Sequence, residues 1–569
     1  MSWPYHFIDV SDDQKHERRV LLDRYGICAQ LSVLVPILGF QLYRLAIWVS
    51  SARSRAKTAY SEVPGSPMLK YRRPSTSRTL GRKWRSASWY LSDEFVPSWG
   101  RRGRLIGAGI WTAWLLFLCV HKTGDDYMHI TKRFGEVAAS QFPFHYMLSM
   151  KSFASPVAFL LHSSHEDLMP YHQISGRIIW VLLVQHGSWY LNSFIQRGIL
   201  LQILTSNRAV ILGMIAITFM NIIASSSLAI VRKWNYRAFF LVHVVLGISL
   251  PILLFFHASH MRIYMVEALA IFIIDVIARK LNTITGFATI TKVPNTKLLK
   301  INLLLPESKL ARFQAAAGQH VYLNIPHEST PPRTSNPSIH DLLYNPFTVA
   351  EVSDSSITLV VRSLKGPTSK ALDMLSTSSK SRPPINIEGP YGASKKFPNL
   401  ANYDRILLVG GGVGATFVLP IYRDVRDQLE TEGKSPENVH LVWSMRSRYE
   451  AAWLSANTDD SLEKHANVQL YYTRTALDDH RDEIAPEDGS IELFDNMSLV
   501  QGNTEMPSGR HERPDLGKIV DDVFRLGFEE TVAILVCGPT KLASDLRKHV
   551  GAWVGQGREV FWHDESFGL

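Results

Sequence analysis

The chain has little cysteine. Its 569 residues include three, Cys28, Cys119 and Cys537. They are too far apart for a zinc cluster and too few to cross-link a small extracellular domain, which excludes both folding devices. The first 25 residues are polar and mixed in charge, without an apolar stretch followed by a small-residue cleavage site, so we expect no cleavable signal peptide. With 46% hydrophobic residues, the chain can form two or three packed domains.

Acidic residues are scarce in one segment. Residues 51–104 contain 13 Lys and Arg but three Asp and Glu, and this excess equals the net charge of +10 of the whole chain. A nucleic-acid-binding surface would interleave basic and aromatic residues on a folded face. This segment is instead rich in Ser and Pro and lies between two apolar stretches. This composition predicts that residues 51–103 form a basic disordered cytosolic loop, with no nucleic-acid partner.

The front half of the chain carries seven apolar runs near the length that a helix needs to cross a membrane. The basic loops would all face the cytosol if the N-terminus is outside, and every alternate loop agrees. We therefore expect an extracytoplasmic segment 1–26, a transmembrane anchor 27–50 and a six-span domain 104–280. The expected spans are 27–49, 104–121, 143–162, 173–194, 208–230, 238–257 and 263–279, and the expected outward loops are 122–142, 195–207 and 258–262.

Two of these spans contain histidine pairs with the same spacing. The fourth has His172 and His186, and the sixth has His243 and His257, each pair 14 residues apart. Fourteen residues are about 40° short of four helical turns, so the two histidines of a pair share one helix face, about 21 Å apart along the axis. Two imidazoles on opposite sides of a haem iron are a common axial arrangement. We therefore expect two haem sites, His172 with His243 on the inner side and His186 with His257 on the outer side.

A histidine within a membrane span can also have a role other than binding a metal. A single histidine in a span is as often a hydrogen-bonding residue between helices, but the repeated spacing favours metal ligands. His260 and Arg262 could hold a haem propionate or attract an anionic chelate, and ordinary interfacial residues explain them about as well. His145, His162 and His165 lack the matching spacing, so we expect structural roles for them.

The back half reads as two domains of different class. After Lys280, short β-like runs alternate with Gly and Pro turns, which predicts a small β-barrel over residues 281–395. Apolar runs then alternate with helical stretches, which predicts a parallel sheet with helices on both faces over residues 396–569. The expected fold class is a multidomain membrane protein, an all-α haem-binding transmembrane bundle followed by a β-barrel and an α/β nucleotide-binding domain.

A glycine loop follows the first buried strand of the α/β part. Residues 405–409 lead into Gly410-Gly411-Gly412-Val413-Gly414-Ala415-Thr416, where glycines would let the backbone approach a pyrophosphate at a helix N-terminus. Alone this signal is weak, because glycine turns after strands are common. Cys537-Gly538-Pro539 ends another hydrophobic strand and would lie at the carboxyl edge of the sheet, where ligands bind in such folds.

The paired histidines, Asn345-Pro346-Phe347-Thr348, the glycine loop and Cys537-Gly538-Pro539 together resemble the ferric reductase transmembrane family, and fungal ferric-chelate reductases most. The resemblance covers roughly residues 104–569. It implies a ferredoxin reductase-like module after the bundle, with FAD in the barrel, NADPH in the α/β domain and two haem b groups in the membrane. In the related NADPH oxidases the second histidine pair is usually one residue closer together, so the equal spacing here favours the metalloreductases.

The resemblance implies a flavin site in the barrel. Phe347 would lie near the isoalloxazine, and Thr348 would bond to it. The family usually has His where this chain has Asn345, which weakens one expected flavin contact. The residues expected to bind FAD are Gly318, Gln319, Tyr322, Asn345, Pro346, Phe347, Thr348, Arg362, Gly366 and Thr368.

The resemblance also implies a dinucleotide site. Arg446 matches the position of an arginine near the adenosine 2′-phosphate, and Arg448 is a second cation, so NADPH is favoured over NADH unless both are solvated loop charges. Cys537 would approach the nicotinamide, and Phe567 in the closing Glu565-Ser566-Phe567 motif would cover the flavin. The other residues expected at the dinucleotide are Gly389, Pro390, Tyr391, Gly392, Gly411, Gly412, Gly414, Thr416, Gly538 and Pro539.

The expected cofactors set the expected reaction. Nicotinamide gives up two electrons together, a haem accepts one, and a flavin can do both, so the flavin belongs between them. The resemblance implies a transmembrane NADPH-dependent reductase of extracytoplasmic ferric or cupric chelates. Two alternatives stay open, an oxidase that reduces dioxygen to superoxide and a transporter with a regulatory nucleotide-binding module.

The expected location is a lipid membrane. The apolar spans indicate an integral membrane protein, in the plasma membrane or alternatively the vacuolar membrane, with its nucleotide domains in the cytosol. The resemblance makes a permease or a multicopper oxidase in the same membrane the expected class of protein partner.

Overall fold

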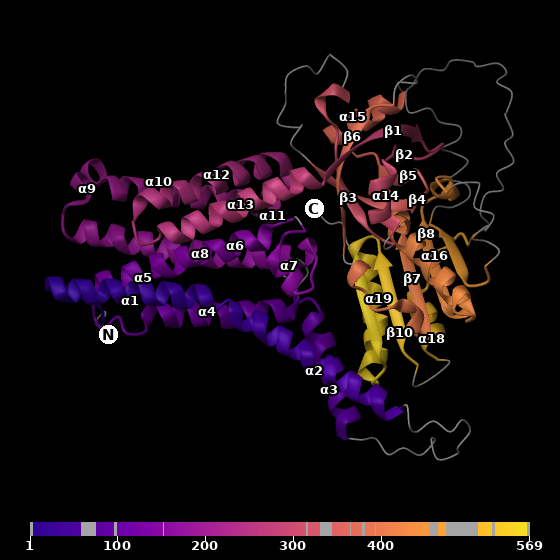
Figure 1. Ribbon diagram of the computed structural model, residues 1–569, viewed down its shortest axis with the longest axis horizontal. Helices are drawn as coiled ribbons and strands as arrows, with labels where there is room; N and C mark the ends of the chain where they lie inside the picture. The colour runs from indigo at the N-terminus through magenta and orange to yellow at the C-terminus, as the bar shows by residue number, and fades with distance from the viewer. Residues whose placement is uncertain are drawn as a thin grey trace. The chain divides into compact units, whose positions relative to one another are not determined.

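The structure is a computed structural model in which the chain forms two compact units (Figure 1). The helical unit takes the described parts of residues 1–73 and 90–281, and the second unit takes those of residues 74–89 and 282–568. The structure describes residues 4–58, 76–95, 100–151, 153–314, 317–329, 344–364, 366–377, 382–392, 394–454, 462, 465–473, 510–525 and 530–565.

Side-chain caps fix where the long helices of the helical unit begin. At α8, Ser164 Oγ accepts a hydrogen bond from the Asp167 amide, and the Asp167 carboxylate accepts one from the Ser164 amide in return. At α10, the side chain of Asn207 accepts from the first free amides. The helices are α1 (Asp12–Leu31), α2 (Leu34–Thr58), α4 (Arg102–Val120), α5 (Tyr127–Ser140), α6 (Phe142–Ser149), α7 (Pro156–Leu160), α8 (His165–Gln196), α9 (Leu200–Ser206), α10 (Arg208–Ser226), α11 (Ala229–Trp234), α12 (Tyr236–His257) and α13 (Arg262–Asn282).

Among the described residues, four helical stretches are long and apolar enough to cross a membrane. They are Asp12–Ser50, which joins α1 and α2, and the helices α4, α10 and α12. The expected spans 173–194 and 263–279 lie within the long helices α8 and α13, which carry more polar side chains. The helical unit therefore contains an integral membrane domain.

The prediction of a third span over residues 143–162 is wrong. Its residues are divided between α6 and α7, and the expected outward loop 122–142 instead contains α5. Pro143 and Pro156 each stand in the first turn of a new helix, where a missing amide costs little, so they mark helix starts rather than the middle of a span. The helix that was missed, α5, is almost wholly buried although it carries Arg133 and Glu136.

The second unit begins with a closed barrel in the strand order β1-β2-β5-β4-β3-β6. Its apolar side chains alternate inward along each strand, and Ile301, Leu323, Leu359 and Ile387 are fully buried. β3 lies between β4 and β6, so these three strands are neighbours. The elements are β1 (Thr283–Lys292), β2 (Leu298–Leu304), α14 (Glu307–Gln314), β3 (His320–Asn324), β4 (Asn345–Val352), β5 (Ser356–Arg362), α15 (Pro367–Thr377) and β6 (Pro384–Tyr391).

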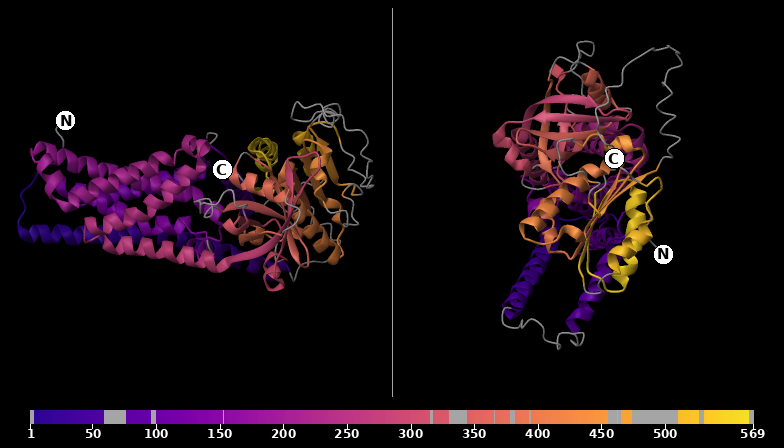
Figure 2. Two further views of the ribbon diagram at one scale, coloured as in Figure 1. Left: turned by 90° about the horizontal axis from the view of Figure 1, so that it is seen from above. Right: turned by 90° about the vertical axis from the view of Figure 1, so that its right-hand side faces the viewer.

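A parallel sheet of five strands follows, in the order β11-β10-β7-β8-β9. The strands β7 and β10 are buried along almost their whole length because helices cover both faces, and the right-hand view of Figure 2 shows the sheet between α16 and α19. The elements are β7 (Arg405–Gly411), α16 (Ala415–Thr431), β8 (Val439–Met445), β9 (Val468–Tyr472), α18 (Leu516–Phe524), β10 (Val532–Cys537), α19 (Thr540–Gly555) and β11 (Val560–Glu565).

The expected disordered loop contains a helix, α3 (Thr76–Ser92), and its first part packs on the parallel sheet domain. The ring of Trp89 lies 5.8 Å from that of Trp562 on β11, and the guanidinium of Arg547 on α19 lies 4.2 Å from the Trp89 ring centre. Gly551 leaves room for Trp89, because a Cβ there would lie 2.9 Å from its Nε1. The expectation of disorder therefore fails for this part of the basic segment.

Candidate functional site

The inner histidine pair is brought together by two helices. His172 on α8 and His243 on α12 have ring centres 6.1 Å apart. A metal ion held by two imidazole nitrogens at about 2 Å each needs about 4 Å between those nitrogens, which rings at this separation can provide. The sequence paired these two residues across different spans, and the structure places them next to each other.

The outer pair lies against glycines of neighbouring helices. His186 lies on α8, and His257 is the last residue of α12. A Cβ on Gly135 of α5 would lie 2.7 Å from Cε1 of His186, and a Cβ on Gly213 of α10 would lie 2.7 Å from Cε1 of His257. Each imidazole therefore occupies space that a side chain at position 135 or 213 would fill if the residue there were not glycine.

All four imidazoles are held through Nδ1. His172 donates to the carbonyl of His145 at 3.1 Å, His186 to that of Thr131 at 2.8 Å, and His257 to that of Ala209 at 2.6 Å. A carbonyl only accepts, so in each of these rings the proton is on Nδ1. His243 Nδ1 lies 3.2 Å from Ser227 Oγ.

The fourth imidazole, that of His243, also has its proton on Nδ1. The Ser227 hydroxyl donates its proton to the Ile223 carbonyl at 2.6 Å, so its oxygen accepts from His243 Nδ1. In the neutral form of each ring, Nε2 is then the nitrogen without a proton. Metal-binding histidines typically have this arrangement, with one nitrogen hydrogen-bonded and the other free for the metal. The residues therefore fit two haem groups.

A fifth histidine, which the sequence assigned a structural role, lies at the inner pair. The His145 ring stacks on His172 with ring centres 4.0 Å apart and an interplanar angle of 14°. Its Nδ1 is 2.7 Å from Ser175 Oγ, and a Cβ on Gly176 would be 3.0 Å from its Cε1. The spacing of histidines along a span could not reveal it, because His145 belongs to α6 rather than to either ligand-bearing helix.

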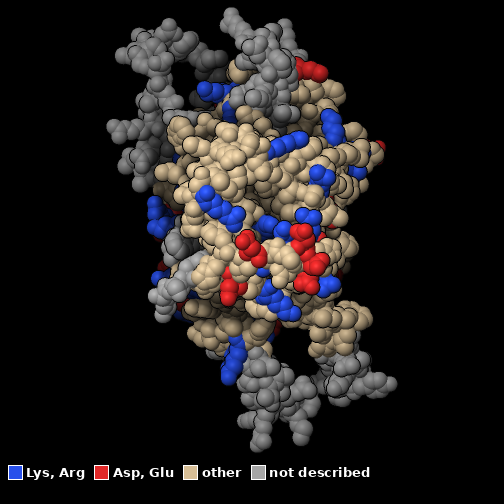
Figure 3. Space-filling view, turned by 90° about the vertical axis from the view of Figure 1, so that its left-hand side faces the viewer, with Lys and Arg blue, Asp and Glu red and all other residues tan. Residues whose placement is uncertain are grey.

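The polar residues beyond the outer pair have partners inside the protein. His260 Nε2 lies 3.2 Å from the buried carboxylate of Glu136, and Arg262 Nε donates to the Phe255 carbonyl at 3.2 Å. Within the described residues, no group of three His, Cys, Asp or Glu could hold a metal ion. Figure 3 shows Lys and Arg interspersed with Asp and Glu on the face at the left of Figure 1, without a block of one sign.

Strand pairing in the barrel gathers the residues expected at the flavin. β3 pairs with β4 so that Tyr322 faces Pro346 and Val321 faces Phe347, and it pairs with β6 so that His320 faces Tyr391. The segments around Gly318, Phe347 and Gly389 are therefore adjacent although they are far apart in the sequence. Gly389 to Gly392, expected at the dinucleotide, end β6 beside β3 in the barrel.

The polar side chains of this group indicate a ligand site. Gln319 is 3% exposed, and neither atom of its side-chain amide has a hydrogen-bond partner among the described residues. A buried amide without a partner is costly, and a flavin in the barrel would supply partners. Asn345 donates to Thr368 Oγ1 at 2.8 Å, so the residue that departs from the family pattern contacts another expected flavin residue.

The two turn motifs of the parallel sheet form one site. β10 pairs with β7 so that Cys537 lies opposite Gly410, which puts both turns at the carboxyl edge of the sheet. A Cβ on Gly414 would lie 2.2 Å from the Cys537 carbonyl oxygen, and a Cβ on Gly411 would lie 2.8 Å from Pro539. Glycine is thus required for the turns to touch. Thr416 lies in the first turn of α16, and its hydroxyl donates to the Val413 carbonyl at 2.8 Å.

The Cys537 thiol is uncharged at this site. It is 3% exposed, and burial raises its pKa well above the ordinary value, with the nearby Glu565 carboxylate adding to the rise. A neutral thiol is a weak nucleophile, so Cys537 can pack against a ligand without attacking it. Glu565 ends β11 opposite Cys537. Phe567, expected to cover the flavin, lies outside the described residues.

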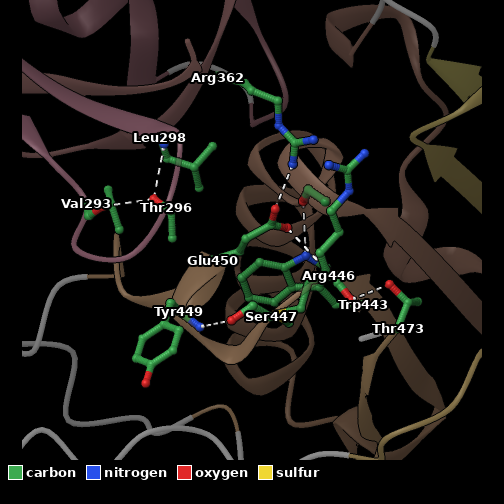
Figure 4. Close-up of polar contacts among 12 residues, drawn as sticks. Val293, Thr296, Leu298, Arg362, Trp443, Arg446, Ser447, Tyr449, Glu450 and Thr473 are labelled. Carbon is green, nitrogen blue, oxygen red and sulfur yellow. Dashed lines mark hydrogen bonds and ion pairs between the residues drawn. The ribbon is translucent and has the colours of Figure 1, made fainter. Parts of the chain in front are cut away.

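Arg362 and Arg446 meet near the glycine loop (Figure 4). Arg362, at the end of β5, forms an ion pair with Glu450 at 2.8 Å, and the backbone amide of Arg446 donates to the same carboxylate at 3.4 Å. The side chain of Arg446 is exposed and extends beside that of Arg362. Trp443 Nε1 donates to the Gly412 carbonyl at 3.0 Å and holds the loop against β8. The sequence did not single out Glu450, because a lone carboxylate after a strand matches no motif.

Comparison with known families identifies the chain. Profiles described as ferric reductase like transmembrane component, FAD-binding domain and ferric reductase NAD binding domain match residues 134–255, 287–395 and 403–551. Together they cover more than half of the chain, and in the order predicted from the sequence. The chain belongs to the ferric reductase family.

Relatives of this ferric reductase family member are distant in sequence. It is 24% identical to ferric reductase transmembrane component 1 of Schizosaccharomyces pombe, over 77% of this chain and 79% of the relative. It is 21% identical to ferric/cupric reductase transmembrane component 2 of the same organism, over 77% and 80%. Among solved structures, the ferredoxin reductase of carbazole 1,9a-dioxygenase matches with a TM-score of 0.31 and 15% identity, over 49% of this chain and 68% of that chain.

Membership confirms the predicted family and fold class. The ferric reductase family member is an integral membrane oxidoreductase whose chain continues from a helical domain into a FAD-binding barrel and a nicotinamide-nucleotide-binding sheet.

Proposed function

We propose that this protein transfers electrons from cytosolic NADPH across a membrane to ferric or cupric chelates, with FAD and two haem b groups as its resident cofactors. The observation that carries the proposal is the common state of the four histidines. Each has Nδ1 hydrogen-bonded, which leaves Nε2 as the free nitrogen of the neutral ring, and one pair on α8 and α12 already lies at a separation suited to a shared metal. The names of the ferric and ferric/cupric reductase relatives support the choice of acceptor.

The chain's own residues hold and orient these groups. His172 and His243 would ligate the inner haem, and His186 and His257 the outer one, while FAD supplies the exchange between two-electron and one-electron chemistry. In the barrel, Gln319 offers an unpaired amide to the flavin, and Phe347 and Thr348 lie on the adjacent strand. The contact between Gly414 and the Cys537 carbonyl brings the two turns of the dinucleotide site together.

The number of histidines at each proposed haem site supports the choice of electron acceptor. If two imidazoles hold each haem, the protein would leave no iron position open for a further ligand. An acceptor reduced without binding to the metal, such as a ferric or cupric chelate, fits this site. The proposed location is the plasma membrane, because chelated metals are met there, and Arg446 supports NADPH as the donor through its place after β8.

Purified protein reconstituted in vesicles tests the proposal. We expect the reduced-minus-oxidised spectrum of two b-type haems, and NADPH supplied at the nucleotide domains should reduce a membrane-impermeant ferric or cupric chelate on the other side. His186→Ala and His257→Ala should each remove about half of the haem absorbance and abolish transmembrane reduction. His165→Ala is the matched control on α8, since His165 Nδ1 binds the Met150 carbonyl and the residue is outside both pairs.

Three results would contradict the proposal. A protein without b-type haem bands cannot use the four histidines as haem ligands. Superoxide released in proportion to NADPH consumption, without any metal chelate, would make the protein an oxidase. Equal haem loss in His165→Ala and His186→Ala would show that any histidine substitution on α8 disrupts the bundle.

A further inference from the structure

A buried carboxylate occupies a position among groups that would bind a phosphate. Glu450 lies in the short turn Arg448–Ala451 after β8 and is 8% exposed. Its Oε1 accepts a hydrogen bond from the Arg362 guanidinium at 2.8 Å, and its Oε2 accepts one from the Arg446 amide at 3.4 Å. Figure 4 shows the Arg446 side chain reaching toward the same place.

The donors around Glu450 come from both domains of the second unit and meet at the glycine loop. Arg362 ends β5 of the barrel, whereas Arg446 follows β8 of the sheet. A Cβ on Gly412 would lie 3.3 Å from the guanidinium nitrogen of Arg362 and 3.7 Å from Oε2 of Glu450. A guanidinium, a backbone amide and a glycine loop before a helix are the usual donors to a phosphate.

We propose that Glu450 is a placeholder for the diphosphate of the nicotinamide dinucleotide and sets the affinity of the site for NADPH. The inference rests on the proposed function, which takes NADPH as the electron donor. Without the dinucleotide, the carboxylate satisfies the Arg362 guanidinium and the Arg446 amide. The diphosphate displaces it from these donors, and Glu450 then stays as a negative charge beside a negative ligand.

A purely structural ion pair would behave in the opposite way. If the contact between Arg362 and Glu450 only held the barrel to the sheet, its loss would leave the arginine poorly oriented and NADPH would bind more weakly. If Glu450 competes with the diphosphate, removing its charge makes NADPH bind more tightly. The direction of the change in KM therefore separates the two roles.

The test is Glu450→Gln in the full-length, FAD-loaded protein. The substitution removes the charge and keeps an acceptor for the Arg446 amide. We expect KM for NADPH to fall about fivefold or more, since unit charges a few ångström apart at a partly buried site interact by at least about 1 kcal/mol. KM is measured from the reduction of a soluble dye. KM for NADH should fall by a similar factor, because both dinucleotides carry the diphosphate.

Glu437→Gln is the matched control. It removes one negative charge from an exposed position of the same domain, just before β8, so an unchanged KM there excludes a general charge effect. Glu450→Ala is a second variant and should change KM in the same direction. A KM that rises or stays constant in both Glu450 variants overturns the inference. Tighter FAD binding with an unchanged KM for NADPH also overturns it. A wild-type protein that does not oxidise NADPH would refute the proposed function instead.

Discussion

Four imidazole rings in the helical unit use the same nitrogen, Nδ1, for a hydrogen bond. Three of them are fixed by carbonyls of residues 131, 145 and 209, which lie on helices other than the histidine's own, and the fourth is fixed by Ser227. A backbone carbonyl cannot be removed by mutation, so this orientation is resistant to sequence change. The ring stacked on the inner pair is different, because it is a side chain that can be deleted.

His145→Ala isolates the contribution of that stacked ring. The variant keeps the carbonyl that accepts from His172 Nδ1 but loses the ring 4.0 Å from it. An aromatic pair of this kind contributes about 1 kcal/mol, so we expect about fivefold weaker retention of the inner haem and no change at the outer one. Transfer of haem to apomyoglobin, followed by absorbance, measures this.

The control for this experiment is His165→Ala, which removes a histidine of α8 bound to a different carbonyl. Equal retention of both haems in His145→Ala and the wild type would show that the stacked ring has no positioning role.

The residues found from the sequence are those whose chemistry repeats at a fixed spacing. The histidine pairs and the glycine loop are of this kind. His145 and Glu450 could not be predicted, because the contacts that distinguish them form only in the tertiary fold. Asn345 was noticed as a departure from a family pattern, but its bond to Thr368 depends on how β4 and α15 pack.

At the scale of elements, the sequence did not indicate the helices α3 and α5. α5 carries charged residues that lower its hydropathy, yet the protein buries nearly all of it. α3 lies in a segment whose basic and serine-rich composition favours disorder, and Trp89 supplies the apolar contact that composition alone cannot weigh. Hydropathy thus located α4, α10 and α12 but not α5, whose charged side chains lie buried inside the bundle.

Two glycines of α19 allow a matched test of α3 docking. A Cβ on Gly551 would meet Trp89 at 2.9 Å, whereas a Cβ on Gly555 would meet nothing within 4 Å. Alanine favours helix by up to about 1 kcal/mol at either position. We expect Gly555→Ala to leave α3 in place and Gly551→Ala to displace it.

Amide hydrogen exchange over residues 81–89 measures the docking of α3. Exchange should accelerate in Gly551→Ala and stay at the wild-type rate in Gly555→Ala. Equal protection in the two variants would mean that Trp89 does not depend on the space at Gly551.

At the scale of the whole molecule, the alternation of basic and neutral loops predicts the orientation in the membrane. If α5 and α6 together take the place of the expected third span, the predicted number of crossings and the predicted orientation stay the same. Gln196 then faces outward and Lys233 faces the cytosol, and both are exposed in the structure.

Single cysteines test this orientation. In a background with Cys28 replaced by Ser, Gln196→Cys should react with a membrane-impermeant maleimide on intact cells. Lys233→Cys should react after permeabilisation only, since Cys119 and Cys537 are buried and contribute little background. The reverse pattern would place the nucleotide domains outside the cytosol.

The carbonyl anchors of the histidines link cofactor supply to the amount of protein in the cell. Occupying the outer site would tie α8 to α5 through Thr131 and α12 to α10 through Ala209, so one prosthetic group would brace four helices. Ligand that binds only the folded state adds its binding free energy to stability. Cells short of haem should therefore degrade this protein rather than accumulate an inactive form, and its abundance should follow haem synthesis.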